Sequence, residues 1–264
     1  MFFSGEIRGK GESRLQVLRL DGVSKSYPNG TVAVQDANLE VGEGELISFV
    51  GPSGCGKSTI FQMVAGLSKQ TAGEIEILGG STGQARRDNA ISFVFQEATL
   101  MPWASVRDNV ALPLKLRKLP PKQQEEEAER VLELVGLKDH AKSLPRQLSG
   151  GMRMRVSIAR SLIAKPRILL MDEPFGALDE ITRQTLQEEL LSIWQRSKGM
   201  TVLFVTHNAF EAVYLSNRIL VMTPRPGRIS REIEVDVPYP RGEQFRSSAE
   251  FSRFVGLVNE SLKH

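Results

Sequence analysis

Residues 46 to 59 have the sequence Leu46-Ile47-Ser48-Phe49-Val50-Gly51-Pro52-Ser53-Gly54-Cys55-Gly56-Lys57-Ser58-Thr59. The stretch begins with a nearly unbroken apolar run, which is typical of a buried parallel strand. A complete P-loop follows, in which glycines let the backbone wrap the phosphates of a nucleotide. Lys57 is placed to neutralise β- and γ-phosphate charge, and Ser58 can bring its hydroxyl to Mg²⁺. Because a helical pattern from Thr59 to Leu67 comes next, the order of strand, loop and helix predicts nucleotide binding.

Further strand patterns lie on both sides of this unit. Between Arg14 and Val41, apolar and polar residues alternate around the turn Pro28-Asn29-Gly30, which predicts antiparallel strands. Helical patterns separate several of the other expected strands, an order that predicts a doubly wound α/β core. These buried strands are expected at Ile91–Phe95, Ile168–Met171, Val202–Val205 and Ile219–Met222.

Two segments depart from this alternation. From about Val106 to Leu148 a helical insertion is expected, since Lys122–Val135 has one apolar face and Gly136 is placed to end the helix. The tail has Pro and Gly residues followed by apolar residues at helical spacing, which predicts a linker and a docked helix. We therefore expect a single domain over residues 14–264, an insertion at about 100–160, a C-terminal linker and helix at about 230–264, and a flexible segment at 1–13.

Composition narrows the function classes. The chain has 264 residues, of which 41% are hydrophobic, enough for a sizeable core. Its 34 basic and 31 acidic residues give a formal net charge of +3, too balanced to indicate a nucleic-acid-binding protein. The single cysteine, Cys55, fits a reducing cytosolic compartment and is interpreted as a small filler side chain in the loop. We expect no secretory signal, and no apolar run reaches the roughly 20 residues that span a bilayer.

Two carboxylates end the predicted strand that precedes Pro174. Asp172 is placed to hold Mg²⁺ through its coordination shell, and Glu173 to polarise the attacking water. Alone, the pattern fits a strand that ends in a solvated acidic turn equally well. Beside a P-loop, the catalytic interpretation is favoured.

A second glycine-rich segment, Leu148-Ser149-Gly150-Gly151-Met152, precedes a predicted helix over Arg153–Ala164. Ser149 and the amides of Gly150 and Gly151 then lie at the positive end of a helix dipole, which favours an anion. Ser-Gly-Gly alone is common in linkers. One domain seldom needs two phosphate cradles, so we expect the second to bind a phosphate held by a partner chain, and a dimer to close over ATP.

Taken in order, the motifs resemble those of the ATP-binding-cassette (ABC) ATPases over almost the entire chain. The residues that carry this resemblance are Gly51–Thr59, Gln96, Leu148–Met152, Ile168–Pro174, Ala177-Leu178-Asp179 and His207. Phe95–Trp103 and Phe175–Arg183 look most like importer subunits for nitrate, sulfonate, taurine, bicarbonate and related compounds. The resemblance implies a P-loop core with a mixed central sheet, an N-terminal antiparallel β subdomain and an inserted α-helical subdomain.

The resemblance also implies roles for individual residues. Gln96 would contact Mg²⁺ or the attacking water, and His207 the γ-phosphate, although they could also be a polar strand end and a cap. Ser149 and Gly151 would hold the γ-phosphate of the opposite subunit. Two further residues complete the nucleotide-binding set: Asp179, lining the dimer interface, and Tyr27, stacking on adenine, unless its ring only packs locally.

A bacterial-type importer ATPase is therefore expected, which binds ATP and Mg²⁺ and pairs with an identical copy or a paralogue. It would contact transmembrane permease subunits near Gln96–Trp103, work indirectly with a substrate-binding protein, and lie peripherally on the cytoplasmic side of the inner membrane, without nucleic acid. The alternatives are a soluble ABC ATPase acting on nucleic acid or ribosomes, and a P-loop phosphotransferase, which would leave Leu148–Met152 without a role.

Several side chains fall outside this scheme. Met154 and Asn208 depart from the family pattern, which more often has Gln and an acidic residue at these positions. His140 and His264 match no motif and are interpreted as surface residues. The helix predicted over Ile181–Trp194 is expected to contribute to the core.

Overall fold

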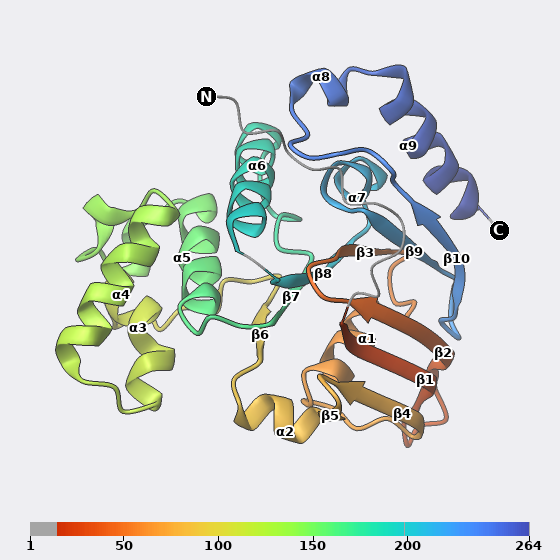
Figure 1. Ribbon diagram of the computed structural model, residues 1–264, viewed down its shortest axis with the longest axis horizontal. Helices are drawn as coiled ribbons and strands as arrows, with labels where there is room; N and C mark the ends of the chain where they lie inside the picture. The colour runs from red at the N-terminus through yellow and green to blue at the C-terminus, as the bar shows by residue number, and fades with distance from the viewer. Residues whose placement is uncertain (1–14, 198, 264) are drawn as a thin grey trace.

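The computed structural model describes residues 15–197 and 199–263 (Figure 1). Its large sheet contains, in spatial order, β10 (Ile229–Glu234), β9 (Arg218–Met222), β3 (Leu46–Val50), β8 (Thr201–Thr206), β7 (Ile168–Asp172) and β6 (Ile91–Val94). The strands from β9 to β6 are parallel, and only β10 pairs antiparallel with its neighbour among these described strands. The predicted α/β class is confirmed, and each predicted buried strand is present.

A smaller antiparallel sheet lies beside the first. It has the order β2 (Val32–Gly42), β1 (Gln16–Ser26), β4 (Ala72–Ile77) and β5 (Gly80–Ser81). The β1–β2 hairpin forms where alternation predicted it, and its turn closes with the Gly30 amide donating to the Tyr27 carbonyl at 3.0 Å. Gly30 has a φ of 81°, a conformation that glycine adopts without penalty.

The two faces of the large sheet are covered by different layers. Along β3, Leu46 and Val50 face one hydrophobic cluster, while Ile47 and Phe49 face the other. The second cluster includes α1 (Lys57–Val64) and the small sheet. The first includes α5 (Gly150–Leu162), α6 (Glu180–Arg196), α7 (Ala209–Leu215) and α9 (Ala249–Ser261). The sheet is therefore buried on both faces, as parallel strands require.

The helical insertion lies to one side of the large sheet (Figure 1). It consists of α3 (Val106–Leu116), α4 (Pro121–Leu134), the short turns η1 (Lys138–His140) and η2 (Pro145–Gln147), and α5. The predicted end of α4 has its expected cause: Gly136 has a φ of 67° and donates to the Glu133 carbonyl at 3.1 Å. Buried Asn109 accepts from the Met101 amide through Oδ1 and donates to the Met101 carbonyl through Nδ2, which fixes the segment before α3.

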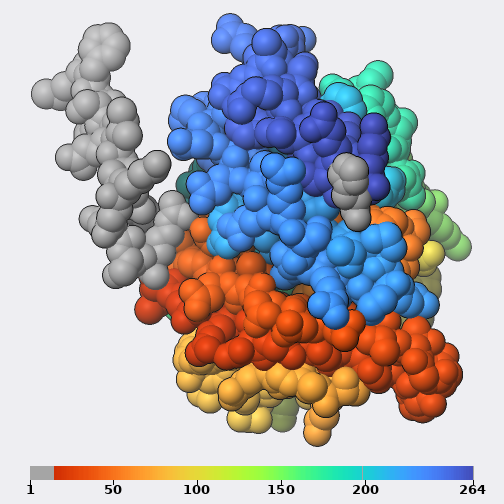
Figure 2. Space-filling model, turned by 90° about the vertical axis from the view of Figure 1, so that its right-hand side faces the viewer, coloured from red at the N-terminus to blue at the C-terminus, as the bar shows by residue number. Residues whose placement is uncertain are grey.

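The C-terminal segment adds β10, α8 (Glu243–Arg246) and α9, and Figure 2 shows it above the N-terminal strands on one face of the molecule. The terminal helix was predicted, and its Phe251, Phe254 and Val258 are buried. β10 was not, because this edge strand buries a single residue, Ile233, and otherwise looks like a charged linker. Buried Arg241 anchors the tail by donating to the carbonyls of Val213, Tyr214, Ser216, Val235 and Val237.

Other short elements were also missed, namely β4, β5 and α2 (Thr82–Arg87). The segment expected to be flexible, 1–13, and His264 lie outside the described residues, whereas His140 is exposed as expected. Across the described ranges, every helix is too short or too polar to cross a membrane.

Candidate nucleotide-binding site

A cavity of about 420 Å³ opens where β3, β6 and β7 end. Its walls come from segments that are far apart in the sequence, and binding at the carboxyl ends of strands is the rule for open α/β sheets. The lining residues are Tyr27, Ala33, Ser53, Gly54, Cys55, Gly56, Lys57, Ser58, Thr59, Gln96, Asp172, Glu173 and Arg225. The structure therefore brings together the P-loop, the strand-end carboxylates, Gln96 and Tyr27.

The backbone of the P-loop is suited to an anion. Gly56 has a φ of 104°, and a Cβ built on it would lie 2.7 Å from the Ala33 carbonyl oxygen, so only glycine fits there. Helix α1 begins at Lys57, and no described side chain caps its N-terminus or adds an acidic group to its first turn. The positive end of this helix is consequently left for phosphate.

Lys57 lies inside the loop, where its side chain is 4% exposed. Its Nζ donates to the carbonyl oxygens of Gly51 at 2.8 Å and Pro52 at 3.1 Å. These neutral acceptors hold the ammonium at the centre of the loop without neutralising its charge. The charge thus remains available to a phosphate.

The oxygen ligands suited to Mg²⁺ come from different segments of the chain and meet at the cavity wall. Ser58 Oγ donates to Asp172 Oδ1 at 3.0 Å, and burial raises the pKa of Asp172 above its ordinary value, opposed by the Ser58 hydrogen bond. No group of three or more His, Cys, Asp or Glu side chains suited to a metal occurs in the described part of the chain. One carboxylate, a hydroxyl and an amide fit Mg²⁺, which takes its remaining ligands from water and substrate phosphates.

Glu173 follows β7 in the left-handed region, with a φ of 44°. Its amide donates to the Val205 carbonyl at 3.0 Å, and its carbonyl accepts from the Gly176 amide at 3.2 Å. A non-glycine residue with this φ is held against a cost of order 1–3 kcal/mol, typical of functional sites. The conformation brings Glu173 Oε2 to 3.2 Å from His207 Nδ1, at the end of the neighbouring strand β8.

Gln96 joins this pair from the end of β6. A Cβ built on Gly176 would lie 3.9 Å from Gln96 Nε2 and 3.9 Å from Glu173 Oε2, so both polar groups lie close to Gly176. The three predicted catalytic side chains therefore extend from the ends of adjacent strands. They can surround a water molecule next to the phosphate cradle.

Two residues of the β9–β10 turn contribute to the site and were given no role in the sequence analysis. Arg225 donates to the Gly54 carbonyl from Nη2 at 3.0 Å and Nε at 3.2 Å. A Cβ on Gly227 would lie 1.8 Å from the Cys55 carbonyl oxygen, so the turn lies directly against the P-loop. Neither residue belongs to a local motif. The Pro-Arg-Pro-Gly run at 224–227 is the only signal that a tight turn occurs there.

The second cradle lies elsewhere. Of the described residues that line the cavity, none belongs to Leu148–Met152. Ser149 caps α5, its Oγ accepting from the Met152 amide at 3.2 Å, and Ser149 and Gly150 are exposed. Gly151 is buried against Thr182, whose Cγ2 would lie 2.5 Å from an added Cβ. The two cradles are thus not brought together within one chain.

Asp179 is also outside the cavity. Its carboxylate caps α6 by accepting from the Thr182 amide at 3.0 Å and from Thr182 Oγ1 at 2.7 Å, which lowers its pKa. Tyr27 is 38% exposed at the cavity rim, and the Lys25 ammonium lies 5.4 Å from the centre of its ring. Its face is accessible for stacking.

Met154 and Asn208, which depart from the family pattern, each have a defined structural environment. Met154 is buried in the core beneath the second cradle, where an apolar side chain packs without needing a polar partner. Asn208 Oδ1 accepts from the Phe210 amide at 2.8 Å and so caps α7. Each residue fits its own location, and neither displaces a group that lines the cavity.

Comparison with known proteins agrees with this geometry. Residues 34–176 match the family model described as ABC transporter. The chain belongs to this family. It is an ATP-binding, ATP-hydrolysing subunit of an ABC transporter.

Individual proteins and solved structures show which members of the family the chain resembles. The chain is 43% identical to the aliphatic sulfonates import ATP-binding protein SsuB of Bacillus cereus, covering 92% of this chain and 98% of that protein. It is 41% identical to the nitrate import ATP-binding protein NrtD of Synechococcus elongatus, covering 93% and 90%. Among solved structures, a dimeric post-hydrolysis state of the cassette MJ0796 with ADP and Pi matches with a TM-score of 0.74 and 33% identity, covering 84% of this chain and all of that one. The protein cbiO1 of Clostridium perfringens, part of the ABC transporter complex cbiONQ, matches with a TM-score of 0.77 and 25% identity, covering 92% of this chain and 95% of that one.

The close approach at Gly56 gives a direct test of the cradle. Gly56→Ala should weaken ATP binding at least about tenfold, because the new Cβ would push the loop away from Ala33. Gly79→Ala is the matched control, since Gly79 also has a positive φ, 76°, but nothing lies within 4 Å of its added Cβ. Equilibrium nucleotide binding and thermal unfolding should be measured on both. Equal loss of affinity in the two variants would contradict the steric argument.

Proposed function

We propose that this chain powers an importer of small anions by closing in pairs over ATP and Mg²⁺. One observation carries the proposal: the P-loop lies in a cavity, while the second phosphate cradle lies outside that cavity with Ser149 and Gly150 exposed. A phosphate held in one subunit would meet Leu148–Met152 of a second subunit. Hydrolysis would then depend on closure.

The predicted metal ligands and catalytic side chains each have a definite task under this proposal, and His207 lies beside the cavity next to Glu173. Mg²⁺, held by Ser58, Gln96 and Asp172, would offset the negative charge of the phosphates. Glu173 would orient and polarise the attacking water, and His207 would contact the γ-phosphate. Phosphoryl transfer needs positioning and charge stabilisation more than covalent chemistry, and these residues supply both.

The paired arrangement is supported by the local structure of the second cradle. α5 begins at Gly150, which is exposed, and its cap is a neutral serine. The positive end of its dipole therefore faces outward, where it favours an anion. The dimeric MJ0796 structure supports a homodimer, and pairing with a paralogue would use the same surfaces.

A docking site for the transmembrane permease subunits is proposed at 96–103, beside the helical insertion. Trp103 is 78% exposed there. The segment is nevertheless fixed, since Arg160 donates to the carbonyls of Ala98 and Thr99 at 3.0 Å. A fixed surface with an exposed tryptophan suits a permanent partner helix, which would place this chain peripherally on the cytoplasmic side of the membrane.

The anionic cargo is proposed from the relatives that import sulfonates and nitrate. The substrate would be delivered by a substrate-binding protein and would not touch this chain. Family membership removes the phosphotransferase alternative, and the described surface provides no observation that favours nucleic acid.

Glu173→Gln separates binding from hydrolysis. The variant should bind ATP and accumulate as a dimer, because the substitution leaves the phosphate cradle intact. Its kcat should be at least about 100-fold lower, because the glutamine amide cannot polarise water. Light scattering with ATP and phosphate release are the measurements. Glu129→Gln, on the exposed face of α4, is the control. A Glu173→Gln protein that stays monomeric with ATP and hydrolyses it normally would contradict the proposed mechanism.

Mixed subunits test whether the second cradle acts on the partner. Gly150→Asp adds a charge that repels phosphate, yet its Cβ meets nothing closer than Leu178 at 3.7 Å, and Asp suits a helix start. Gly150→Asp and Lys57→Ala should each be inactive alone. Their mixture should regain measurable hydrolysis, because one site of each mixed dimer is intact. No recovery in mixtures that light scattering shows to be dimeric would contradict the shared site.

Cargo is tested with the whole transporter. Purified with its co-expressed membrane partners in vesicles, the chain should support ATP-dependent uptake of a sulfonate or nitrate. The Glu173→Gln complex is the control. ATP-driven uptake of a cation or a sugar, without uptake of small anions, would overturn the proposed cargo class while leaving the ATPase mechanism intact.

A further inference from the structure

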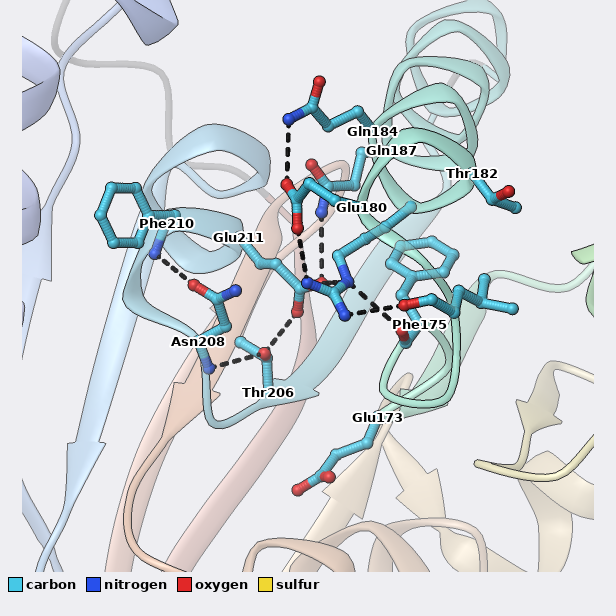
Figure 3. Close-up of polar contacts among 12 residues, drawn as sticks. Glu173, Phe175, Glu180, Thr182, Gln184, Gln187, Thr206, Asn208, Phe210 and Glu211 are labelled. Atoms are coloured by element: carbon cyan, nitrogen blue, oxygen red, sulfur yellow. Dashed lines mark hydrogen bonds and ion pairs between the residues drawn. The ribbon is translucent and has the colours of Figure 1, made fainter.

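A group of polar side chains, three of them buried, links the end of β8 to α6 and α7 outside the cavity (Figure 3). It consists of Thr206 at the end of β8, Arg183 and Gln187 on α6, and Glu211 on α7. We call these four residues the Glu211 cluster. None of them was assigned a role by the motifs described above.

Glu211 is the centre of the cluster and is 7% exposed. Its Oε2 accepts a hydrogen bond from Thr206 Oγ1, and its Oε1 accepts from Gln187 Nε2 at 3.2 Å. Arg183 Nε lies 3.5 Å from Oε1 and is the basic partner of this carboxylate. Burial raises the pKa of Glu211, whereas Thr206, Arg183 and Gln187 lower it. Burying charged side chains lowers the stability of the fold. Apolar residues of similar volume in the same space would lower it less.

One side of the cluster fixes the backbone around His207. Thr206 Oγ1 donates to Glu211 and accepts from the Asn208 amide at 3.0 Å. The residues on either side of His207 are therefore joined through one hydroxyl group. That hydroxyl is in turn fixed by Glu211.

The other side fixes the loop between Glu173 and Asp179. Arg183 Nη2 donates to the Leu178 carbonyl at 2.9 Å, and its Nε donates to the Phe175 carbonyl at 3.4 Å. The same Nε lies 3.5 Å from Glu211 Oε1. Arg183 thereby connects the loop to the same carboxylate that holds Thr206.

We propose that Glu211 is a positioning residue that couples the His207 segment to the Phe175–Asp179 loop, so that both adopt the hydrolytic arrangement together. The proposal rests on the roles proposed above for His207 and Glu173. Glu211 does not touch the nucleotide cavity and acts only through Thr206 and Arg183. Its loss should slow turnover without weakening ATP binding.

Thr206→Val removes the hydroxyl at nearly constant volume, and Thr206→Ser keeps it. The valine variant should lower kcat about tenfold, with the KM for ATP changed less than about twofold, and the serine variant should retain kcat within about twofold. Thr185→Val is the matched control, because that exposed hydroxyl bonds only the Ile181 carbonyl of its own helix. A purely structural role would lower the unfolding temperature of Thr206→Val while kcat stays unchanged, and that result overturns the proposal.

Coupling through Glu211 is tested by combining changes on both sides. Arg183→Lys cannot reach Phe175, Leu178 and Glu211 together, so it should also lower kcat. Because both variants act through Glu211, Thr206→Val with Arg183→Lys should lose less activity than the product of the single effects. Multiplicative losses would show independent roles and overturn the coupling. If the double variant does not fold, Glu211→Gln is measured instead. This change replaces one acceptor oxygen of the carboxylate with an amide NH2 group, which can only donate, so kcat should fall with KM unchanged.

His207→Ala and Glu173→Gln belong in the same assay. If both are inactive while Thr206→Val and Glu211→Gln hydrolyse ATP normally, the positioning role alone is wrong. If His207→Ala and Glu173→Gln turn over normally, the assigned catalytic roles are wrong, whatever the cluster does.

Discussion

The nucleotide cavity depends on one place where two sheets meet through their backbones. The Gly227 amide donates to the Ala33 carbonyl at 3.0 Å, and the Gln35 amide donates to the Gly227 carbonyl at 2.9 Å. The P-loop lies against this bridge, with Gly56 next to Ala33 and Cys55 next to Gly227. The contact leaves no space for a Cβ on either glycine. The shape of the phosphate cradle is therefore determined by chain segments nearly 200 residues apart.

The chemistry follows from the order of the strands. β7 and β8 are parallel neighbours, with Asp172 opposite Val205, so Glu173 and His207 emerge side by side just beyond the sheet. β3 pairs with the other side of β8 and delivers the P-loop to the same edge. Parallel pairing is what brings acid, imidazole and phosphate cradle together, and the crossover connections between the strands, which contain helices, make this pairing possible.

The sequence predicted those parts of the site that consist of a few consecutive residues. The P-loop, the carboxylates after β7 and the cradle before α5 each combine a strand or helix boundary with residues whose chemistry is evident. Arg225 and Gly227 could not be found in this way, because their importance arises from contact with Gly54 and Cys55 across the fold. β10 escaped for a related reason: a charged edge strand with one buried residue has no period-2 pattern. The Glu211 cluster could not be predicted either, because no local sequence pattern indicates that Arg183 and Thr206 lie close together.

Under the proposed function, the isolated chain contains half of each active site. Its P-loop cavity supplies the metal ligands and the base, while its own second cradle faces away. Closure would bring the outward dipole of α5 to the phosphates of the partner, next to Asp179. Because Arg183 holds the loop that precedes Asp179 and Glu211 holds the segment around His207, a change at the subunit interface has a short path to the γ-phosphate side of the cavity. A rigid connection of this kind makes hydrolysis sensitive to closure, whereas the Gly227 bridge determines the shape of the P-loop within each subunit.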